Sequence, residues 1–154
     1  MELKKRYNDL DDTLKHIRLQ IEESIPFAQT FVPRFTNPQS LFIWLKPYLN
    51  YREDPRGVEL LQSFPTLIKS NFYGIPGAGD CDCFTIAQTA ACMVQDWNNC
   101  QLWIKLTGRS PFAARHIYGG VDINGKEIAL DLTNKIPGKE RYYPYIQKLY
   151  IKPL

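Results

Sequence analysis

The sequence feature that most constrains the fold is an Asn124-Gly125 pair between two stretches in which apolar and polar residues alternate. An Asn-Gly pair in this position is the strongest short-range signal of a β-hairpin, and it specifies a two-residue type I′ turn. The flanking stretches therefore predict strands over residues 116–123 and 126–133. The turn also fixes the register, so that Ile123 faces Lys126 and pairing continues residue by residue from there.

This register brings a histidine and an acid to one face of the hairpin. Asp131 is expected opposite Tyr118, and His116 lies two positions further along on the same face. Diagonal neighbours of this kind lie roughly 7–8 Å apart at the backbone, within side-chain reach. The opposite face is apolar and consists of Ile117, Val121, Ile123, Ile128, Leu130 and Leu132. Taken singly, the histidine suits a hydrogen-bonded place near a strand edge, and the acid suits a solvated place before a turn.

A cysteine in a different setting lies upstream, in a glycine-rich stretch from Gly77 to Ala87. The stretch predicts a loop that leads into a helix over residues 80–96, with Asp80 as its N-cap and Cys81 in its first turn. Unpaired backbone N–H groups and the helix dipole lower the pKa of a thiol there, which suits a nucleophile. Cysteine is also a common buried filler, and Asp80 and Asp82 oppose a thiolate, so this stretch alone leaves both interpretations open.

Together these residues make the set that thiol catalysis needs. In this hypothesis Cys81 is the nucleophile, His116 takes its proton and later returns it to the leaving group, and Asp131 orients the imidazole. The combination of a helix-start cysteine, a strand histidine and a strand acid favours catalysis over three unrelated structural roles. The other histidine, His16, is predicted on the solvated, polar side of an N-terminal helix.

The composition is that of a single globular domain over residues 1–154, with 44% hydrophobic and 13% aromatic residues. We expect an N-terminal helical extension over residues 1–35 and a catalytic core over residues 40–154. A net charge of +3, with scattered lysines and arginines, argues against a nucleic-acid partner. No apolar run reaches the roughly 20 residues of a membrane span, and the charged N-terminus leads into no signal-peptide core, so we expect a cytoplasmic protein.

The cysteines are expected to be thiols, because a cytoplasm keeps them reduced. They are Cys81, Cys83, Cys92 and Cys100. Structural zinc sites pair their ligands as Cys-x₂₋₄-Cys with a second pair further on, and this chain has no such spacing. We therefore expect neither a metal nor another cofactor.

An apolar seam predicts a helix over residues 2–24 that Pro26 ends. The seam repeats every three or four residues and consists of Leu3, Tyr7, Leu10, Leu14, Ile17 and Ile21. A seam this short favours packing against the chain's own core, and the alternative is self-association or a coiled-coil contact with a partner protein. Residues 27–38 are expected to form a loop.

Local signals predict the remaining elements. Asn37 as N-cap and Pro38 as the first helical residue predict a short helix that stops before Pro47. The others are a turn over residues 51–57, a helix that starts at residues 58–61 and is interrupted near Pro65, and strands over residues 101–106 and 145–151.

Three short motifs resemble the catalytic motifs of the transglutaminase-like superfamily. They are Gly79-Asp80-Cys81-Asp82, His116-Ile117-Tyr118-Gly119-Gly120-Val121 and Leu130-Asp131-Leu132-Thr133. The Asp54-Pro55-x-Gly57-Val58-Glu59 run also looks like a segment of bacterial and phage members. The resemblance covers roughly residues 40 to 134 and implies an α+β, papain-like fold, in which a cysteine-bearing helix packs on an antiparallel sheet. It implies Cys81 as nucleophile, His116 as general base and then acid, and Asp131 as the residue that orients the histidine.

The chain departs from the family pattern at two places. Cys83 stands where the family commonly has a second acid. The upstream side chain of the oxyanion hole has no obvious counterpart, and Asn71 and Tyr73 are the nearest suggestions. The backbone N–H of Cys81 is expected to supply one oxyanion donor. No segment resembles a calcium loop, so we expect no calcium dependence.

The resemblance implies a cysteine-dependent hydrolase or acyltransferase that acts on an amide, peptide or isopeptide bond of a peptide or protein substrate. It also points to a phage-encoded protein in a bacterial or phage-infected cytoplasm, or associated with a virion. The alternative is a non-catalytic module of this fold that contacts a phage protein or a second copy. Its contact surface would be the N-terminal seam or a basic, aromatic stretch with Arg141, Tyr142, Tyr143 and Tyr145. A metal or redox protein built on the four cysteines is the third hypothesis.

Overall fold

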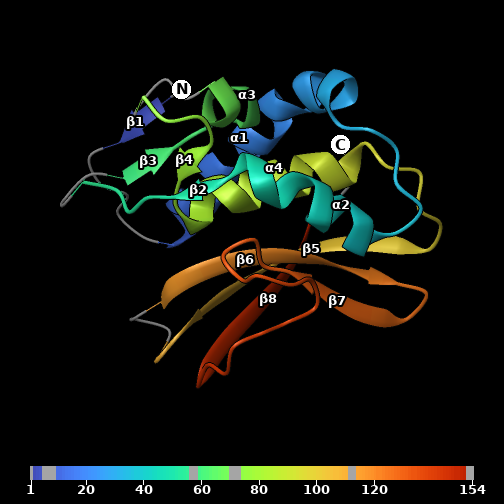
Figure 1. Cartoon of the computed structure of the whole chain (residues 1–154). Coiled ribbons are helices and arrows are strands. Elements are labelled where there is room, and N and C mark those ends of the chain that lie inside the picture. Colours follow the sequence, from blue (N-terminus) through green and yellow to red (C-terminus); the bar gives the residue numbers. More distant parts are fainter. Residues whose placement is uncertain (1, 5–9, 56–58, 70–73, 111–113, 152–154) are drawn as a thin grey trace.

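The structure, a computed structural model, describes residues 2–4, 10–55, 59–69, 74–110 and 114–151. In Figure 1, the helices pack on one face of a four-stranded antiparallel sheet, which forms the lower layer of the molecule. The sheet contains β5 (Cys100–Gly108), β6 (Ala114–Ile123), β7 (Lys126–Leu130) and β8 (Tyr145–Ile151), in the order β7-β6-β5-β8. The expected α+β class with an antiparallel sheet is confirmed. β8 has the predicted bounds, and β5 extends past both of its predicted ends.

Helices and two short strand pairs form the upper layer. The helices are α1 (Leu10–Phe31), α2 (Pro38–Leu45), the 3-10 turn η1 (Lys46–Tyr48), α3 (Phe64–Lys69) and α4 (Cys81–Met93). The strand pairs are β1 (Glu2–Lys4) with β3 (Glu59–Leu61), antiparallel, and β2 (Asn50–Tyr51) with β4 (Ala78–Gly79), parallel. Helix α4 contacts α1, α2, α3 and β6, so it is the central element of the molecule.

The hairpin of β6 and β7 forms in the predicted register. Asn124 and Gly125 have φ angles of +52° and +76°, as a type I′ turn requires. Ile123 pairs with Lys126, and the pairing continues without a bulge to the end of β7. The faces predicted from this register are therefore those of the folded sheet.

Strand β7 ends at Leu130, earlier than the predicted boundary at residue 133, because Asp131 starts a turn. Its carboxylate accepts a hydrogen bond from the backbone N–H of Thr133 at 3.0 Å. The N–H of Asn134 donates to the Asp131 carbonyl at 2.9 Å. An aspartate that bonds to the backbone two residues on offers the chain an alternative to the sheet, so the strand stops there.

Helix α4 starts and stays buried for reasons visible in its sequence. Asp80 caps it as predicted, and its carboxylate accepts from the N–H groups of Asp82 and Cys83. The helix ends at Met93, three residues before the predicted boundary. On the sheet side, Gly119 leaves room for Gln88, whose side-chain oxygen would lie 1.9 Å from a Cβ at that position. A glycine in β6 therefore allows the close approach of helix and sheet.

Helix α1 corrects the prediction for the N-terminus. It spans Leu10–Phe31, whereas residues 2–4 form a strand, and Pro26 lies inside the helix. Proline removes one backbone hydrogen bond from a helix. Here the turn after it is held by packing, since the Phe27 ring lies 4.9 Å from that of Phe31 and 5.1 Å from that of Phe64. The predicted loop over residues 27–38 is correspondingly shorter.

The apolar seam of α1 packs against the molecule's own core, which is the arrangement that its short length favoured. Ile17 and Ile21 are each 1% exposed and cluster with Ile86 of α4 and with apolar residues of β5 and β6, and Leu14 packs against the same cluster. Of the other seam positions, Leu3 lies in β1 instead of the helix, and Tyr7 lies outside the described residues.

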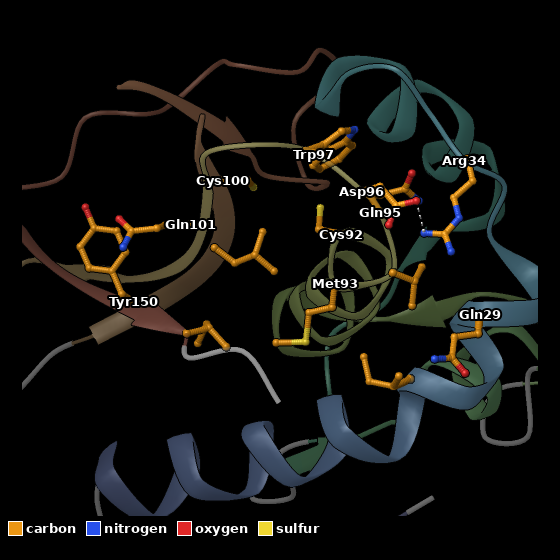
Figure 2. A pocket seen from close by; sticks show the side chains of 14 residues that line it. Gln29, Arg34, Cys92, Met93, Gln95, Asp96, Trp97, Cys100, Gln101 and Tyr150 are labelled. Atoms are coloured by element: carbon orange, nitrogen blue, oxygen red, sulfur yellow. Dashed lines mark ion pairs between the residues drawn. The ribbon is translucent and has the colours of Figure 1, made fainter. Parts of the chain in front are cut away.

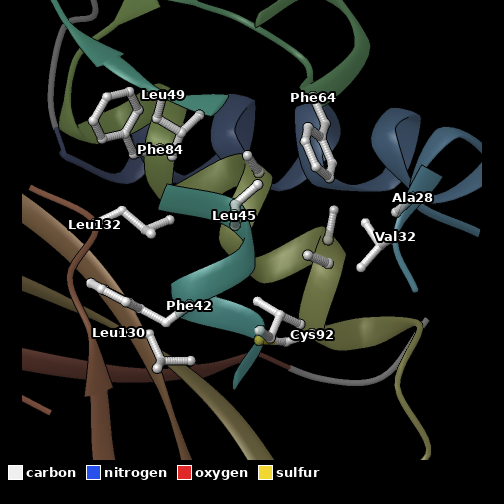
Figure 3. Packing of buried hydrophobic residues seen from close by; sticks show 14 of the residues in the cluster. Ala28, Val32, Phe42, Leu45, Leu49, Phe64, Phe84, Cys92, Leu130 and Leu132 are labelled. Carbon is white, nitrogen blue, oxygen red and sulfur yellow. The ribbon is translucent and has the colours of Figure 1, made fainter. Parts of the chain in front are cut away.

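Helix α2 matches its prediction. The Asn37 side chain accepts from the N–H of Ser40 at 2.8 Å, and Pro38 is the first helical residue. Phe42 and Leu45 of this helix lie in one buried cluster with Leu130, as Figure 3 shows.

The segment before α3 was predicted wrongly as a helix start. Residues 59–61 form β3, because they pair with β1 near the N-terminus. Helix α3 begins only at Phe64, and Pro65 lies in its first turn, where no N–H partner is lost. Of the predicted turn, residues 52–55 have no regular structure, and residues 56–57 lie outside the described part.

A pair of glycine substitutions tests the packing of the loop before α4. Gly77 and Gly125 have similar positive φ angles, but a Cβ at Gly77 would lie 1.7 Å from the Tyr48 carbonyl oxygen, whereas a Cβ at Gly125 meets nothing within 4 Å. We expect Gly125→Ala to cost about 1 kcal/mol of unfolding free energy, and Gly77→Ala to cost about 3 kcal/mol or more. Urea unfolding measures both, and equal losses would contradict the close contact.

Candidate functional site

Cys81 is the first residue of α4, where the sequence placed it. The Asp80 side chain accepts hydrogen bonds from the N–H groups of Asp82 and Cys83 at 3.1 and 3.4 Å, so the N–H of Cys81 itself is not part of this cap. The Thr85 hydroxyl lies 2.7 Å from the Cys81 carbonyl and 3.3 Å from the Ile117 carbonyl. This hydroxyl joins the start of the helix to β6 beside His116.

His116 and Asp131 meet as the hairpin register predicted. His116 Nε2 lies 2.7 Å from Asp131 Oδ2, and Asp131 is 3% exposed. The second carboxylate oxygen, Oδ1, accepts from the Thr133 hydroxyl at 2.7 Å and from its N–H. Both oxygens are thus held, and the Nε2 position of the imidazole is fixed with them.

Cys81 and His116 line one cavity of about 330 Å³ at the N-terminal end of α4. Asp131, which is in contact with His116, does not line it. Among the described contacts, no hydrogen bond joins the thiol to the imidazole directly. Because Asp131 occupies Nε2, Nδ1 is the ring nitrogen left for a second partner. Catalytic hydrogen bonds often tighten only when substrate is bound.

The electrostatics at Cys81 are unfavourable for a free thiolate. Burial raises the pKa of the Cys81 thiol well above its ordinary value, and the charges of Asp82 and Asp80 raise it further. A hydrogen bond with the Ile117 backbone acts in the opposite direction. The Cys81 thiol lies 3.8 Å from Asp82 Oδ1 and donates weakly to it. The helix start alone therefore does not activate this cysteine.

Cys83 is separated from the site. It is fully buried, its thiol donates to the Leu60 carbonyl at 3.2 Å, and the Gln62 amide lies 3.6 Å from its sulfur. A carboxylate at this position would face the Leu60 carbonyl oxygen without water, which explains why an acid does not suit this chain here. The structure thus places only Cys81 of the two thiols in the cavity.

The structure corrects the prediction for His16, and two residues suggested for the oxyanion hole lie outside the described part of the chain. His16 is half-buried rather than solvated, and its Nδ1 lies 2.8 Å from the Asp12 carbonyl of its own helix. Asn71 and Tyr73, suggested for the oxyanion hole, lie outside the described residues. Among the residues that are described, no group of His, Cys, Asp and Glu side chains is arranged to hold a metal ion.

Three contributors to the site escaped the sequence analysis. Thr133 anchors Asp131, and an Asp-x-Thr sequence at a strand end is a local turn signal that would have indicated it. Lys46 donates to the Leu132 carbonyl, and its charge acts on Asp131. Tyr143 stacks on His116 at a ring distance of 5.9 Å. The last two come from distant segments and carry no local signal.

A larger cavity, of about 630 Å³, lies at the opposite end of α4 and is shown in Figure 2. Cys92, Met93 and Trp97 line it, and Arg34 forms an ion pair with Asp96 at its edge, 3.7 Å apart. None of the three predicted catalytic residues reaches it. The chemistry that the sequence predicted is therefore confined to the smaller cavity.

Comparison of the chain with protein-family models, with curated proteins and with solved structures yields no match. In the described part of the chain, none of the helices has the length and apolar character needed to cross a membrane.

The hydrogen bonds of Asp131 should make the stability of the folded protein depend on pH, and this dependence can be measured. Burial alone would raise the pKa of this carboxyl, but the bonds from His116 and Thr133 outweigh it and lower the pKa below its ordinary value of 3.8. The unfolded chain therefore takes up this proton first, so the stability that Asp131 contributes is complete above about pH 4 and is lost as the pH falls through the folded-state pKa.

The urea midpoint of the wild-type protein should accordingly fall more steeply between about pH 4 and pH 2 than that of Asp131→Asn. The exposed acid Asp96 provides the control, since Asp96→Asn should keep the wild-type slope. Parallel slopes for the wild type and Asp131→Asn would contradict the hydrogen-bonded carboxylate.

Proposed function

We propose that this protein is a cysteine-dependent hydrolase or acyltransferase of the transglutaminase-like class, which forms an acyl-enzyme at Cys81. The observation that carries the proposal is the 2.7 Å contact of His116 Nε2 with Asp131, behind a cavity that His116 shares with Cys81. A buried acid on one ring nitrogen and a thiol-bearing cavity beside the ring are what a Cys-His-Asp mechanism needs.

The arrangement of elements supports the same proposal. A helix that begins at the cysteine packs on an antiparallel sheet, in which β6 carries the histidine and the neighbouring β7 leads directly into the acid. This arrangement supports the proposal of the papain-like fold that the three sequence motifs imply. The substrate class, a peptide or protein amide, and the bacterial or phage setting are proposals that rest on the resemblance.

The first half of the reaction would acylate the enzyme. Asp131 holds the imidazole with its proton on Nε2, so Nδ1 accepts the proton of the Cys81 thiol as the sulfur attacks the substrate carbonyl. The backbone N–H of Cys81 is not among the groups that donate to the Asp80 side chain, and it can donate to the developing oxyanion. When the C–N bond breaks, His116 returns the proton to the departing amine.

The second half would release the acyl group. Water, or an amine in an acyl transfer, attacks the thioester and gives its proton to Nδ1 of His116. The C–S bond breaks, and the proton passes to the Cys81 sulfur, which restores the free enzyme. Asp131 stays ionised throughout and stabilises the imidazolium in both halves.

One observation favours a second candidate, a non-catalytic module of the same fold. Burial and the charges of Asp82 and Asp80 raise the pKa of the Cys81 thiol, which disfavours the nucleophilic form. In the catalytic proposal, proton transfer to His116 overcomes this effect, because the thiolate then forms beside an imidazolium. The two candidates therefore differ in whether Cys81 reactivity depends on His116.

An activated ester separates the two candidates without knowledge of the natural substrate. With para-nitrophenyl acetate, we expect a burst of nitrophenol and an acetyl group on Cys81, located by peptide mapping. His116→Gln should slow this acylation about a hundredfold. Cys81→Ala should abolish the burst, and Cys100→Ala, which removes a half-buried thiol outside the site, should retain it.

Acetylation spread evenly over Cys81 and Cys100, or an acylation rate at Cys81 that His116→Gln leaves unchanged, would contradict catalysis and favour the non-catalytic module. A circular-dichroism melt of each variant shows whether a loss of reactivity reflects unfolding.

A further inference from the structure

The imidazole of His116 is part of an aromatic stack. Its ring lies 5.5 Å from that of Tyr118 and 5.9 Å from that of Tyr143, with interplanar angles of 27° and 28°. The two tyrosine rings lie 6.5 Å from each other. Tyr118 comes from the same strand as His116, but Tyr143 comes from the segment that connects β7 to β8.

Hydrogen bonds hold the segment that carries Tyr143 against the outer face of the sheet. Three residues before Tyr143, Glu140 accepts a hydrogen bond from the Tyr118 hydroxyl at 2.6 Å and from Lys105 Nζ at 2.9 Å. Lys105 is 6% exposed and also donates to Glu127. A buried, paired cation on β5 thus holds this segment beside the stack.

The Tyr143 phenol lies close to the reacting groups as well. Burial raises its pKa, the Asp131 carboxylate raises it further, and the Cys81 charge is among the remaining contributors. Thr107 interacts with the Tyr143 hydroxyl and also donates to the His116 carbonyl at 3.0 Å. Tyr143 therefore contacts the histidine through its ring and lies beside the histidine's backbone partner.

The hydrogen bond to Asp131 holds one ring nitrogen, but it does not by itself fix the ring plane, because the imidazole also turns about its Cβ–Cγ bond. Proton transfer with Cys81 needs Nδ1 to point into the cavity, which requires a defined ring plane. Two nearly parallel aromatic neighbours supply that plane, since stacked rings favour offset, near-parallel packing.

We propose that Tyr143 is a positioning residue that sets the plane of the His116 imidazole, so that Nε2 faces Asp131 and Nδ1 faces Cys81. The proposal rests on the proposed function for its catalytic consequence, but the ring orientation is measurable by itself. The aromatic ring of Tyr143 is the part that matters, and its hydroxyl group is secondary.

Three variants separate these contributions. Tyr143→Phe keeps the ring, Tyr143→Leu removes it, and Tyr142→Leu removes the neighbouring tyrosine, which is 88% exposed and serves as the matched control. Isotope-labelled histidine gives NMR signals from only two residues, and His16 on α1 is the internal reference. Ring-proton shifts report the stack, and ring-nitrogen shifts report which nitrogen carries the proton.

In the wild-type protein we expect His116 ring protons shifted upfield by the tyrosine rings, and a neutral tautomer protonated on Nε2. Tyr143→Leu should lose much of the upfield shift, mix the tautomers and slow acylation of Cys81 by para-nitrophenyl acetate about tenfold. Tyr143→Phe and Tyr142→Leu should retain the wild-type signals and stay within about twofold in rate.

Unchanged His116 signals in Tyr143→Leu would overturn the proposal, whatever happens to the rate. A mixed tautomer with an unchanged acylation rate would also overturn it, because the ring plane would then not matter for proton transfer. If the wild-type protein forms no acyl-enzyme, the proposed function fails, and the NMR signals alone decide whether Tyr143 orients the ring.

Discussion

The type I′ turn at Asn124-Gly125 is the constraint on which the site depends. It sets the register of β6 against β7, and a slip by one residue would move every side chain of one strand to the other face of the sheet. In the observed register, apolar residues of both strands face α4, and His116 meets Asp131 on the outer face. The same turn thus defines both the core and the acid–histidine pair.

The second constraint is electrostatic, and it sets what Cys81 can do. The N-cap that starts α4 requires Asp80, and this acid, together with Asp82, lies beside the half-buried Cys81 thiol. The helix start is therefore stabilised by charges that oppose a thiolate at its first residue. A reactive cysteine at this position needs a cation, and two basic residues, Arg115 and His116, line the cavity that Cys81 lines.

The parts of the fold that were predicted correctly depend on interactions between residues close in sequence. The hairpin turn and the caps at Asn37 and Asp80 are of this kind. The acid–histidine contact was also predictable, because a two-residue turn carries its register along the whole hairpin.

The errors arose where distant segments decide the structure. Pro26 does not end α1, because aromatic packing against Phe64 holds the following turn. Residues 59–61 form a strand because they pair with residues 2–4. Tyr143 stacks on His116 in a segment that Glu140 holds to Lys105 of another strand.

The pH dependence of Cys81 alkylation tests most directly whether the thiol and the imidazole act as one unit. Iodoacetamide rates for each cysteine, resolved by peptide mapping, should show Cys81 reacting well below pH 9, the ordinary thiol pKa, with a plateau on the acid side. His116→Gln should abolish the plateau. A rate at Cys81 that rises only above pH 9, and does so equally with and without His116, would contradict a catalytic pair.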